Sequence, residues 1–216
     1  MQGTRRADDR ASTRERLLEA GERLFAERGL DGVSVRMITA AAGANTAAIH
    51  YHFGSKEALV RAILERRAAE LGARRVELLD RIERDHAPTL GDVVAALVIP
   101  PAELAADHDH GGEHYIGFLA ALLNQPELLP VVTEAFDEHT SRYLEALERV
   151  TPHLSPDVRE VRFALAKDMV NRALSHPGRG LRLWIDHHAP AARGRLTDHL
   201  IDFLTGAFAA PDAGAP

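Results

Sequence analysis

Residues 33–59 read VSVRMITAAAGANTAAIHYHFGSKEAL, and this stretch predicts two short helices joined by a tight turn. Ser34 is suited to cap the first helix, because its hydroxyl can accept a backbone N–H that the helix leaves unbonded. Gly43 is expected to end that helix, since glycine adopts the left-handed conformation at little cost. Asn45 is expected to cap the second helix. Two short helices around a glycine turn form a helix-turn-helix, whose second helix enters the major groove of duplex DNA.

The apolar positions of this stretch indicate which side chains hold it together. Val35, Ile38 and Ala42 recur every three or four residues and form one apolar stripe on the first helix. Ile49 and Phe53 are expected to face back onto that stripe from the second helix. The positions that then face outward are Thr46, His50 and Tyr51.

The composition of the chain is that of an ordinary globular protein rich in helix. Of its 216 residues, 45% are apolar and 27% are charged, and there is no cysteine. Disulfides and thiolate metal sites are therefore excluded. The N-terminal residues have no apolar signal-peptide core, and no window approaches the roughly 18 apolar residues of a membrane span. The sequence predicts a cytoplasmic protein without a membrane partner.

Charge is divided unevenly along the chain, whose net charge is −6. Residues 1–67 contain 12 Lys and Arg against 9 Asp and Glu, while the remainder contains 14 against 23. DNA affinity depends on local neutralisation of phosphates, so a basic N-terminal part is compatible with an acidic remainder.

Helical periodicity without strand alternation predicts an all-α protein of about nine helices in two domains. We expect flexible tails at residues 1–10 and 210–216, a DNA-binding domain at 11–67 with the helix-turn-helix at about 34–53, and a second helical domain at 68–209. The expected helices outside the helix-turn-helix run from Ser12 or Thr13 to Arg28, from Ser55 towards Ile82, from Thr89 to about Val98 before Pro100-Pro101, from Glu113 to Asn124, from Pro126 to about Val150, from Ser155-Pro156 to Ala173, and from Ala191 to Phe208.

Residues 13–60 resemble the DNA-binding region of the TetR/AcrR family of bacterial transcriptional regulators. The resemblance lies in Leu24-Phe25 and Gly29 at the end of the first helix, Val35-Arg36-x-Ile38, Ala42-Gly43, and the run His52-Phe53-x-Ser55-Lys56-Glu57-x-Leu59. It covers under a quarter of the chain, and the remainder is compatible only in helix number and length.

The resemblance implies a homodimer whose two recognition helices read a palindromic operator, with repression as the family's usual outcome. It also implies that the protein is not an enzyme, needs no cofactor, and associates with the bacterial nucleoid when bound to its operator. Many members have Tyr where this chain has His50, so the phosphate contact is open between His50 and Tyr51. The expected DNA-binding residues are Arg36, Asn45, Thr46, Ala47, Ala48, His50, Tyr51, His52 and Lys56.

The chemistry of these residues is consistent with DNA contact. Arg36 and Lys56 can neutralise phosphates, and Thr46 offers a hydroxyl to a phosphate or a base edge. Ala47 and Ala48 are small enough to touch thymine methyl groups.

The resemblance implies that residues 68–209 form an effector-binding and dimerisation domain, in which a small-molecule effector changes the separation of the two DNA-binding domains. The helices around Val158 to Ala173 and Leu196 to Phe208 resemble its dimerisation pair. Candidate effector contacts are apolar positions of the middle helices, which ordinarily would be plain core: Leu97, Phe118, Leu122, Phe136 and Met169.

Three alternatives remain. A metal-responsive regulator would use the histidine-rich stretch 108–114, namely Asp107-His108-Asp109-His110 and His114, with His187-His188 adding further ligands. Its position beside Gly111-Gly112 favours a solvated loop instead, and no metal site is predicted. A hydrolase using the same His and Asp residues is less favoured, because no nucleophile motif is present. The third alternative is a DNA-binding architectural protein without an effector.

Overall fold

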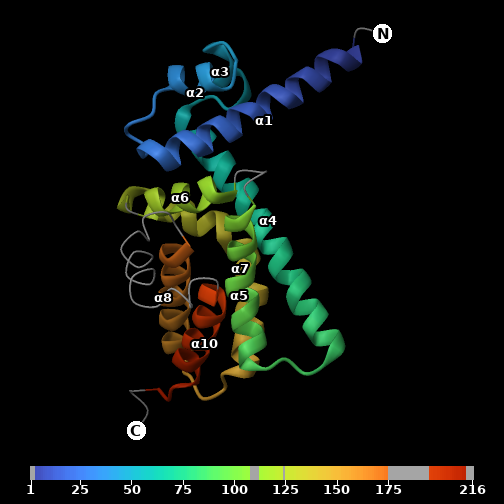
Figure 1. Cartoon of the computed structure of the whole chain (residues 1–216), viewed down its shortest axis with the longest axis vertical. Coiled ribbons are helices and arrows are strands. Elements are labelled where there is room, and N and C mark those ends of the chain that lie inside the picture. Colours follow the sequence, from blue (N-terminus) through green and yellow to red (C-terminus); the bar gives the residue numbers. More distant parts are fainter. Residues whose placement is uncertain (1–2, 108–111, 124, 175–194, 213–216) are drawn as a thin grey trace.

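A computed structural model describes residues 3–107, 112–123, 125–174 and 195–212. Every regular element in these ranges is helical, which confirms the predicted all-α class (Figure 1). The helices are α1 (Gly3–Arg28), α2 (Val35–Ala41), α3 (Ala47–His52), α4 (Lys56–Asp85), α5 (Leu90–Ala106), α6 (Gly112–Leu123), the short 3-10 helix η1 (Pro126–Leu128), α7 (Leu129–Val150), α8 (Pro156–Leu174) and α10 (Leu196–Ala209).

The predicted helix-turn-helix is present as α2 and α3. Ser34 has an extended backbone, and its hydroxyl accepts the Met37 N–H at 3.3 Å. Gly43 follows α2 with φ +60°, and the next residue, Ala44, donates its N–H to the Thr39 carbonyl at 2.8 Å. This left-handed glycine with a returning hydrogen bond is the expected helix stop.

Gly43→Ala is expected to lower the free energy of unfolding by about 1–2 kcal/mol, because an L residue with a side chain is strained at positive φ. No atom lies within 4 Å of the position a Cβ would take, so the cost is conformational and not a collision. Urea unfolding at fixed protein concentration measures it. Gly91→Ala, inside α5, is the control and should be neutral or stabilising. Equal effects of the two changes would contradict this account of the turn.

Three helix starts can be compared with their predictions. Ser55 caps α4 as expected, its hydroxyl accepting the Ala58 N–H at 3.1 Å. The cap predicted at Asn45 is wrong, because the residue before α3 is Thr46, which makes no side-chain capping bond. Asn45 contributes its backbone carbonyl instead, which accepts the Ala48 N–H at 3.0 Å. The cap predicted at Ser12 or Thr13 is wrong, because α1 already begins at Gly3. No Gly or Pro interrupts residues 4–12, so the helix continues through the predicted tail.

The predicted helix stop at Pro100-Pro101 is also wrong, since α5 continues to Ala106. A proline inside a helix leaves the carbonyl four residues earlier without its usual donor. For Pro100 that carbonyl belongs to Ala96, and it accepts a hydrogen bond from Arg75 Nε on α4 at 3.4 Å. A donor from a distant part of the sequence thus supports the helix through the prolines.

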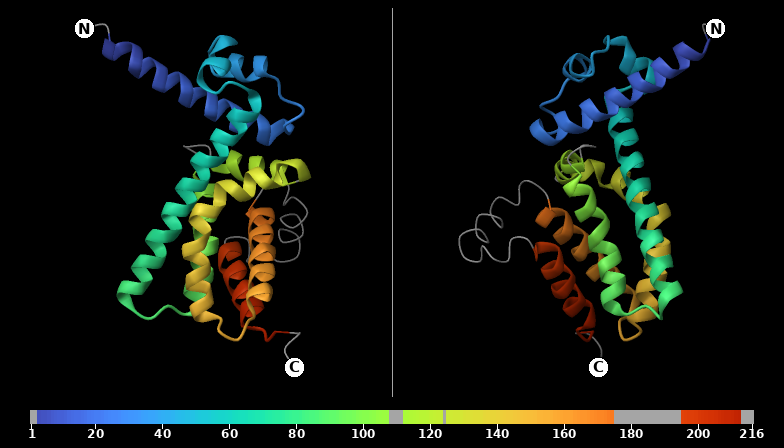
Figure 2. Two further views of the ribbon diagram at one scale, coloured as in Figure 1. Left: turned by 180° about the vertical axis from the view of Figure 1, so that it is seen from behind. Right: turned by 45° about the vertical axis from the view of Figure 1, so that its right-hand side comes forward.

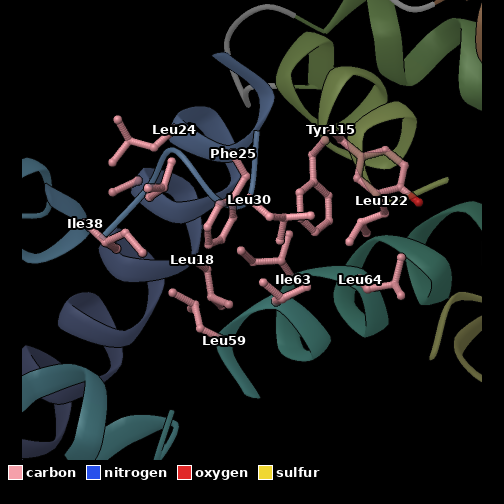
Figure 3. Close-up of a cluster of buried hydrophobic side chains, with 14 of the residues drawn as sticks. Leu18, Leu24, Phe25, Leu30, Ile38, Leu59, Ile63, Leu64, Tyr115 and Leu122 are labelled. Carbon is pink, nitrogen blue, oxygen red and sulfur yellow. The ribbon is translucent and has the colours of Figure 1, made fainter. Parts of the chain in front are cut away.

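Two hydrophobic clusters organise the described helices. One, part of which Figure 3 shows, joins α1, α2, α3 and the first half of α4 to α6. In this cluster the ring centres of Phe25 and Phe118 are 5.9 Å apart. The other joins the second half of α4 to α5, α7, α8 and α10. The predicted domain boundary at residue 67 falls inside α4, which runs from the helix-turn-helix down the side of the body (Figures 1 and 2). We call residues 3–55 the head and the helices α5 to α10 the body.

None of the described helices is both long enough and apolar enough to cross a membrane.

Candidate DNA-binding surface and body cavity

Helices α2 and α3 lie at the end of the molecule opposite α10 and the C-terminus (Figure 1). On α3, Tyr51 is 67% exposed although it is a large aromatic residue, and its ring meets the His52 ring edge-on at 5.0 Å. His50 instead shares a hydrogen bond of 2.9 Å between its Nδ1 and the Gly54 carbonyl, which closes the turn after the helix. The two residues that the sequence left open therefore differ: Tyr51 projects outward, and His50 braces the turn.

The two cations predicted to contact DNA are held differently. Arg36 is exposed on the first turn of α2. The Lys56 ammonium donates to the Leu30 carbonyl at 2.6 Å and lies 5.9 Å from the centre of the Phe25 ring. Since an ammonium has three N–H donors, a phosphate contact by Lys56 would use the donors not directed at Leu30.

The other predicted contacts share the same end of the molecule. Asn45, Thr46 and Ala47 are exposed, whereas Ala48 and His52 are half-buried. Ile49, predicted as core, is fully buried beneath them. The structure therefore brings all of the predicted DNA-binding residues to α2, α3, the turns beside them and the first residue of α4.

Helix α1 supports this surface through two arginines that sequence reasoning missed. Arg16 Nε donates to the Ala42 carbonyl at the end of α2 at 3.0 Å, and the Arg14 guanidinium lies 5.2 Å from the centre of the Phe53 ring. The apolar periodicity of α1 predicts its buried face only, and it carries no signal for which polar residues reach a neighbouring helix.

A buried ion-pair group ties the head to the long helix α4. Glu22 of α1 is 2% exposed and accepts hydrogen bonds from Arg67 at 2.9 and 3.1 Å and from Arg66 at 2.7 Å. Burial raises the pKa of the Glu22 carboxyl, and the hydrogen bonds and charge of Arg67 oppose that shift. The Arg67 guanidinium also lies 5.9 Å from the centre of the Tyr115 ring on α6. Head, α4 and body therefore meet at one group of charges.

The body contains a cavity of about 200 Å³ bounded by α4, α5, α6, α7 and α8. Its walls include Leu119 and Val132 from the cluster shared with the head, and Leu97 and Val170 from the cluster of the body. The cavity thus lies where the two hydrophobic clusters meet. Its remaining wall combines apolar side chains with a rim of polar ones from α7 and α8.

Two of the five predicted effector contacts line this cavity, namely Leu97 and Phe136. Phe118 and Leu122 are buried in the cluster between head and body. Met169 is 36% exposed on the outer side of α8. The apolar periodicity identified helices correctly but could not distinguish a cavity wall from filled core or from an outer face.

The histidine-rich stretch is only partly described. Asp107 and His114 lie on either side of it, whereas His108, His110, His187 and His188 fall outside the described residues. Among the side chains that can be described, no three His, Asp or Glu residues are grouped as metal ligands.

Helices α8 and α10 lie side by side (Figures 1 and 2), and each carries exposed apolar side chains, which together we call the α8–α10 face. Val161 and Leu165 of α8 and Phe203 of α10 are 59%, 63% and 61% exposed, and Met169 continues the row one turn further on. Arg162 fastens the two helices together, because its guanidinium donates to the carbonyls of Ala207 and Ala210 at the end of α10.

An exposed helix-turn-helix on an all-α body with an internal cavity defines a DNA-binding regulator with a separate body domain. The model for bacterial regulatory proteins of the tetR family matches residues 17–63, and the model for the tetracycline repressor-like C-terminal domain matches residues 95–207. The chain therefore belongs to the tetR family of bacterial regulatory proteins. Proteins of this family are DNA-binding transcriptional regulators and not enzymes.

Similar curated proteins match under a third of the chain. The transcriptional repressor AcnR of Corynebacterium efficiens is 39% identical over 64 residues, which are 30% of this chain and 34% of that protein. The transcriptional repressor KstR2 of Rhodococcus jostii is 44% identical over 61 residues, 27% of this chain and 30% of that protein. The chain spans about a third of the length of these relatives.

Solved structures extend the likeness to the whole fold. The ketosteroid transcriptional regulator KstR2 of Mycobacterium tuberculosis has a TM-score of 0.62 at 19% identity, over 90% of this chain and 93% of that one. SmeT, the repressor of a Stenotrophomonas maltophilia multidrug efflux pump, has a TM-score of 0.60 at 19% identity, over 95% and 98%. At these identities the likeness shows the fold alone.

Proposed function

We propose that this protein is a transcriptional repressor that binds a palindromic operator as a homodimer and is released by a small-molecule effector bound in the body cavity. The observation that carries the proposal is the exposed reading surface of α2 and α3, on which Tyr51 is 67% exposed. Repression is supported by the similar curated proteins, which are named as repressors.

In the complex with the operator, Tyr51 is the residue of α3 that contacts a phosphate, and His50 holds the turn after α3. This assignment follows from the exposed Tyr51 ring and from the bond between His50 and the Gly54 carbonyl. Arg36 reaches a base or a phosphate from α2. Asn45, Thr46, Ala47 and Ala48 approach base edges, where a hydroxyl can bond either edge atoms or phosphates and a methyl group can touch thymine.

The homodimer forms through the α8–α10 face. Large apolar side chains exposed in a row along one helix are a usual mark of a protein–protein contact. A two-fold axis across this face gives two heads, and dimeric helix-turn-helix proteins read half-sites about 34–36 Å apart. The operator is accordingly a palindrome with one helical turn between half-site centres.

Release from DNA requires an effector that binds the dimer more tightly at one distance between the two heads than at the other. The cavity is suited to this role because α4 contributes to its wall through Leu71 and also begins beside the helix-turn-helix at Lys56. A ligand that displaces α4 in the cavity moves the head that α4 carries.

The experiment that tests the proposal is selection of bound DNA from a random duplex pool by the full-length protein at moderate salt. We expect recovery of one palindrome with half-site centres about ten base pairs apart. Recovery of unrelated sequences would mean that the protein has no operator, and half-sites recovered singly would argue against the dimer.

Tyr51→Phe is expected to weaken operator binding about 10- to 100-fold, because each head loses a hydrogen bond to a charged phosphate. The salt dependence should stay unchanged, since no charge is removed. Lys56→Gln should reduce the slope of log K against log salt by about 0.9 for each phosphate that is no longer neutralised. Fluorescence anisotropy across a salt series measures both. Wild-type affinity in Tyr51→Phe would assign the phosphate contact to another residue.

A further inference from the structure

Arg75 of α4 is a buried cation in the cavity wall. It is 7% exposed, and its guanidinium lies 5.6 Å from the centre of the Tyr143 ring. Its Nε donates at 3.4 Å to the Ala96 carbonyl, which has no helical donor because Pro100 lacks an N–H. No carboxylate among the described side chains contacts it. A buried charge without an oppositely charged partner is costly, so an acceptor for its terminal nitrogens would be favourable.

A second buried arginine, Arg67, lies two helical turns earlier on the same side of α4 and has different partners. Arg67 is 5% exposed and also lies over a tyrosine ring, that of Tyr115. Its guanidinium is matched by Glu22 at 2.9 Å and by Glu70 at 2.8 Å. Arg75 repeats the burial and the tyrosine contact but has no matching carboxylate within the described part of the chain. Arg75 lines the cavity, whereas Arg67 does not.

We infer that the cavity binds a small monocarboxylic acid with an apolar body, whose carboxylate is paired with the terminal nitrogens of Arg75. This inference rests on the proposed function, because it names the chemical class of the effector. Guanidinium and carboxylate form paired, charge-assisted hydrogen bonds, which makes the carboxylate the matching anion.

The remaining walls favour an anion with one charge and an apolar body. Leu71, Leu97, Leu119 and Phe136 offer an apolar surface, and a volume of about 200 Å³ accommodates a ring or a short alkyl chain. On the rim, Lys167 and Asp168 contribute charges of both signs, and Asp168 is paired with Arg172 at 2.7 Å. A dianion such as a phosphate ester would leave one charge uncompensated at Arg75.

Two buried tyrosines lie near Arg75. The hydroxyls of Tyr115 and Tyr143 are buried, and neither has a hydrogen-bond partner among the described residues. Burial raises the pKa of both, so both remain protonated donors at neutral pH. The charge of Arg75 acts on each of them. Neither tyrosine lines the cavity, so of these three groups only the Arg75 guanidinium belongs to its wall.

The test compares octanoate with octanamide, which has the same chain and no charge, on the full-length protein by calorimetry at neutral pH. We expect octanoate to bind at least about tenfold more tightly than octanamide, and Arg75→Met to remove that preference. Lys167→Met, which removes a rim charge, is the matched control and should keep it. Circular dichroism establishes that each variant is folded.

Three results would overturn the inference. Equal binding of octanoate and octanamide to the wild-type protein would overturn it without any variant, and so would the absence of octanoate binding at millimolar concentration. A preference that disappears in Lys167→Met but persists in Arg75→Met would move the anchor to the rim and overturn the role of Arg75. None of these results depends on DNA, so failure of the repressor proposal is recognised separately, by the absence of a selected operator.

Discussion

Glu22→Gln is expected to lower the free energy of unfolding by about 3–5 kcal/mol, the usual cost of removing one partner from a buried ion pair. Glu22 and Arg67 are both almost fully buried. After the change, the Arg67 cation keeps its pair with the half-exposed Glu70 but loses the buried carboxylate of Glu22. Denaturant unfolding at a fixed protomer concentration measures the loss, because the stability of a dimer depends on concentration.

The control for this change is Glu27→Gln, on the same helix. Glu27 pairs with Arg23 at 3.9 Å, and both side chains are more than two-fifths exposed, so the cost should stay below about 1 kcal/mol. Combining Glu22→Gln with Arg67→Met should recover part of the loss, because the uncompensated charge is then removed. A Glu22→Gln protein no less stable than the control would show that the buried pair contributes nothing.

If the proposed dimer forms through the α8–α10 face, Leu165→Glu is expected to convert it to a monomer and to weaken operator binding by a factor of about 100 or more, roughly the avidity that two linked sites provide. Leu165 is 63% exposed in the protomer, so the carboxylate meets water in the monomer and an apolar surface only in the dimer. The fold of the protomer should therefore be retained. Analytical ultracentrifugation gives the mass, and anisotropy gives the DNA affinity.

Ala69→Glu, at an exposed position of α4 outside the α8–α10 face, is the matched control and should remain dimeric. Phe203→Glu on α10 should reproduce the effect of Leu165→Glu, because both residues belong to the same face. A dimer that persists in both variants would place the dimer contact elsewhere on the molecule.

The parts of this fold that sequence reasoning predicted correctly are those governed by local chemistry. The caps at Ser34 and Ser55 and the stop at Gly43 each depend on residues within one turn of the chain. The stop predicted at Pro100 failed because the donor that supports α5 there comes from Arg75, whose Nε bonds a carbonyl 21 residues further along the sequence. Such a bond leaves no trace in the local pattern.

The candidate sites differ in the same way: residues close together in sequence were correctly predicted to lie together, and residues brought together from distant helices for the most part were not. The residues of the reading surface are close together in sequence, so one motif brought them together on α2, α3 and the adjoining turns. The cavity is assembled from five helices, and only Leu97 and Phe136 of its predicted residues belong to its wall. On α8 the apolar row of Val161, Leu165 and Met169 identified a helix, but periodicity cannot tell a face that meets the core from one that meets a partner.

The core that joins α1 to α6 limits how this protein can be recombined with its relatives. Gly117 of α6 sits so close to α1 that a Cβ added there would lie 3.2 Å from the Cβ of Ala26. A chimera that carries this head on another member's body would need a small residue facing Ala26 and a ring able to meet Phe25. Operator specificity is therefore exchanged more safely by grafting the outward side chains of α3 than by exchanging the whole head.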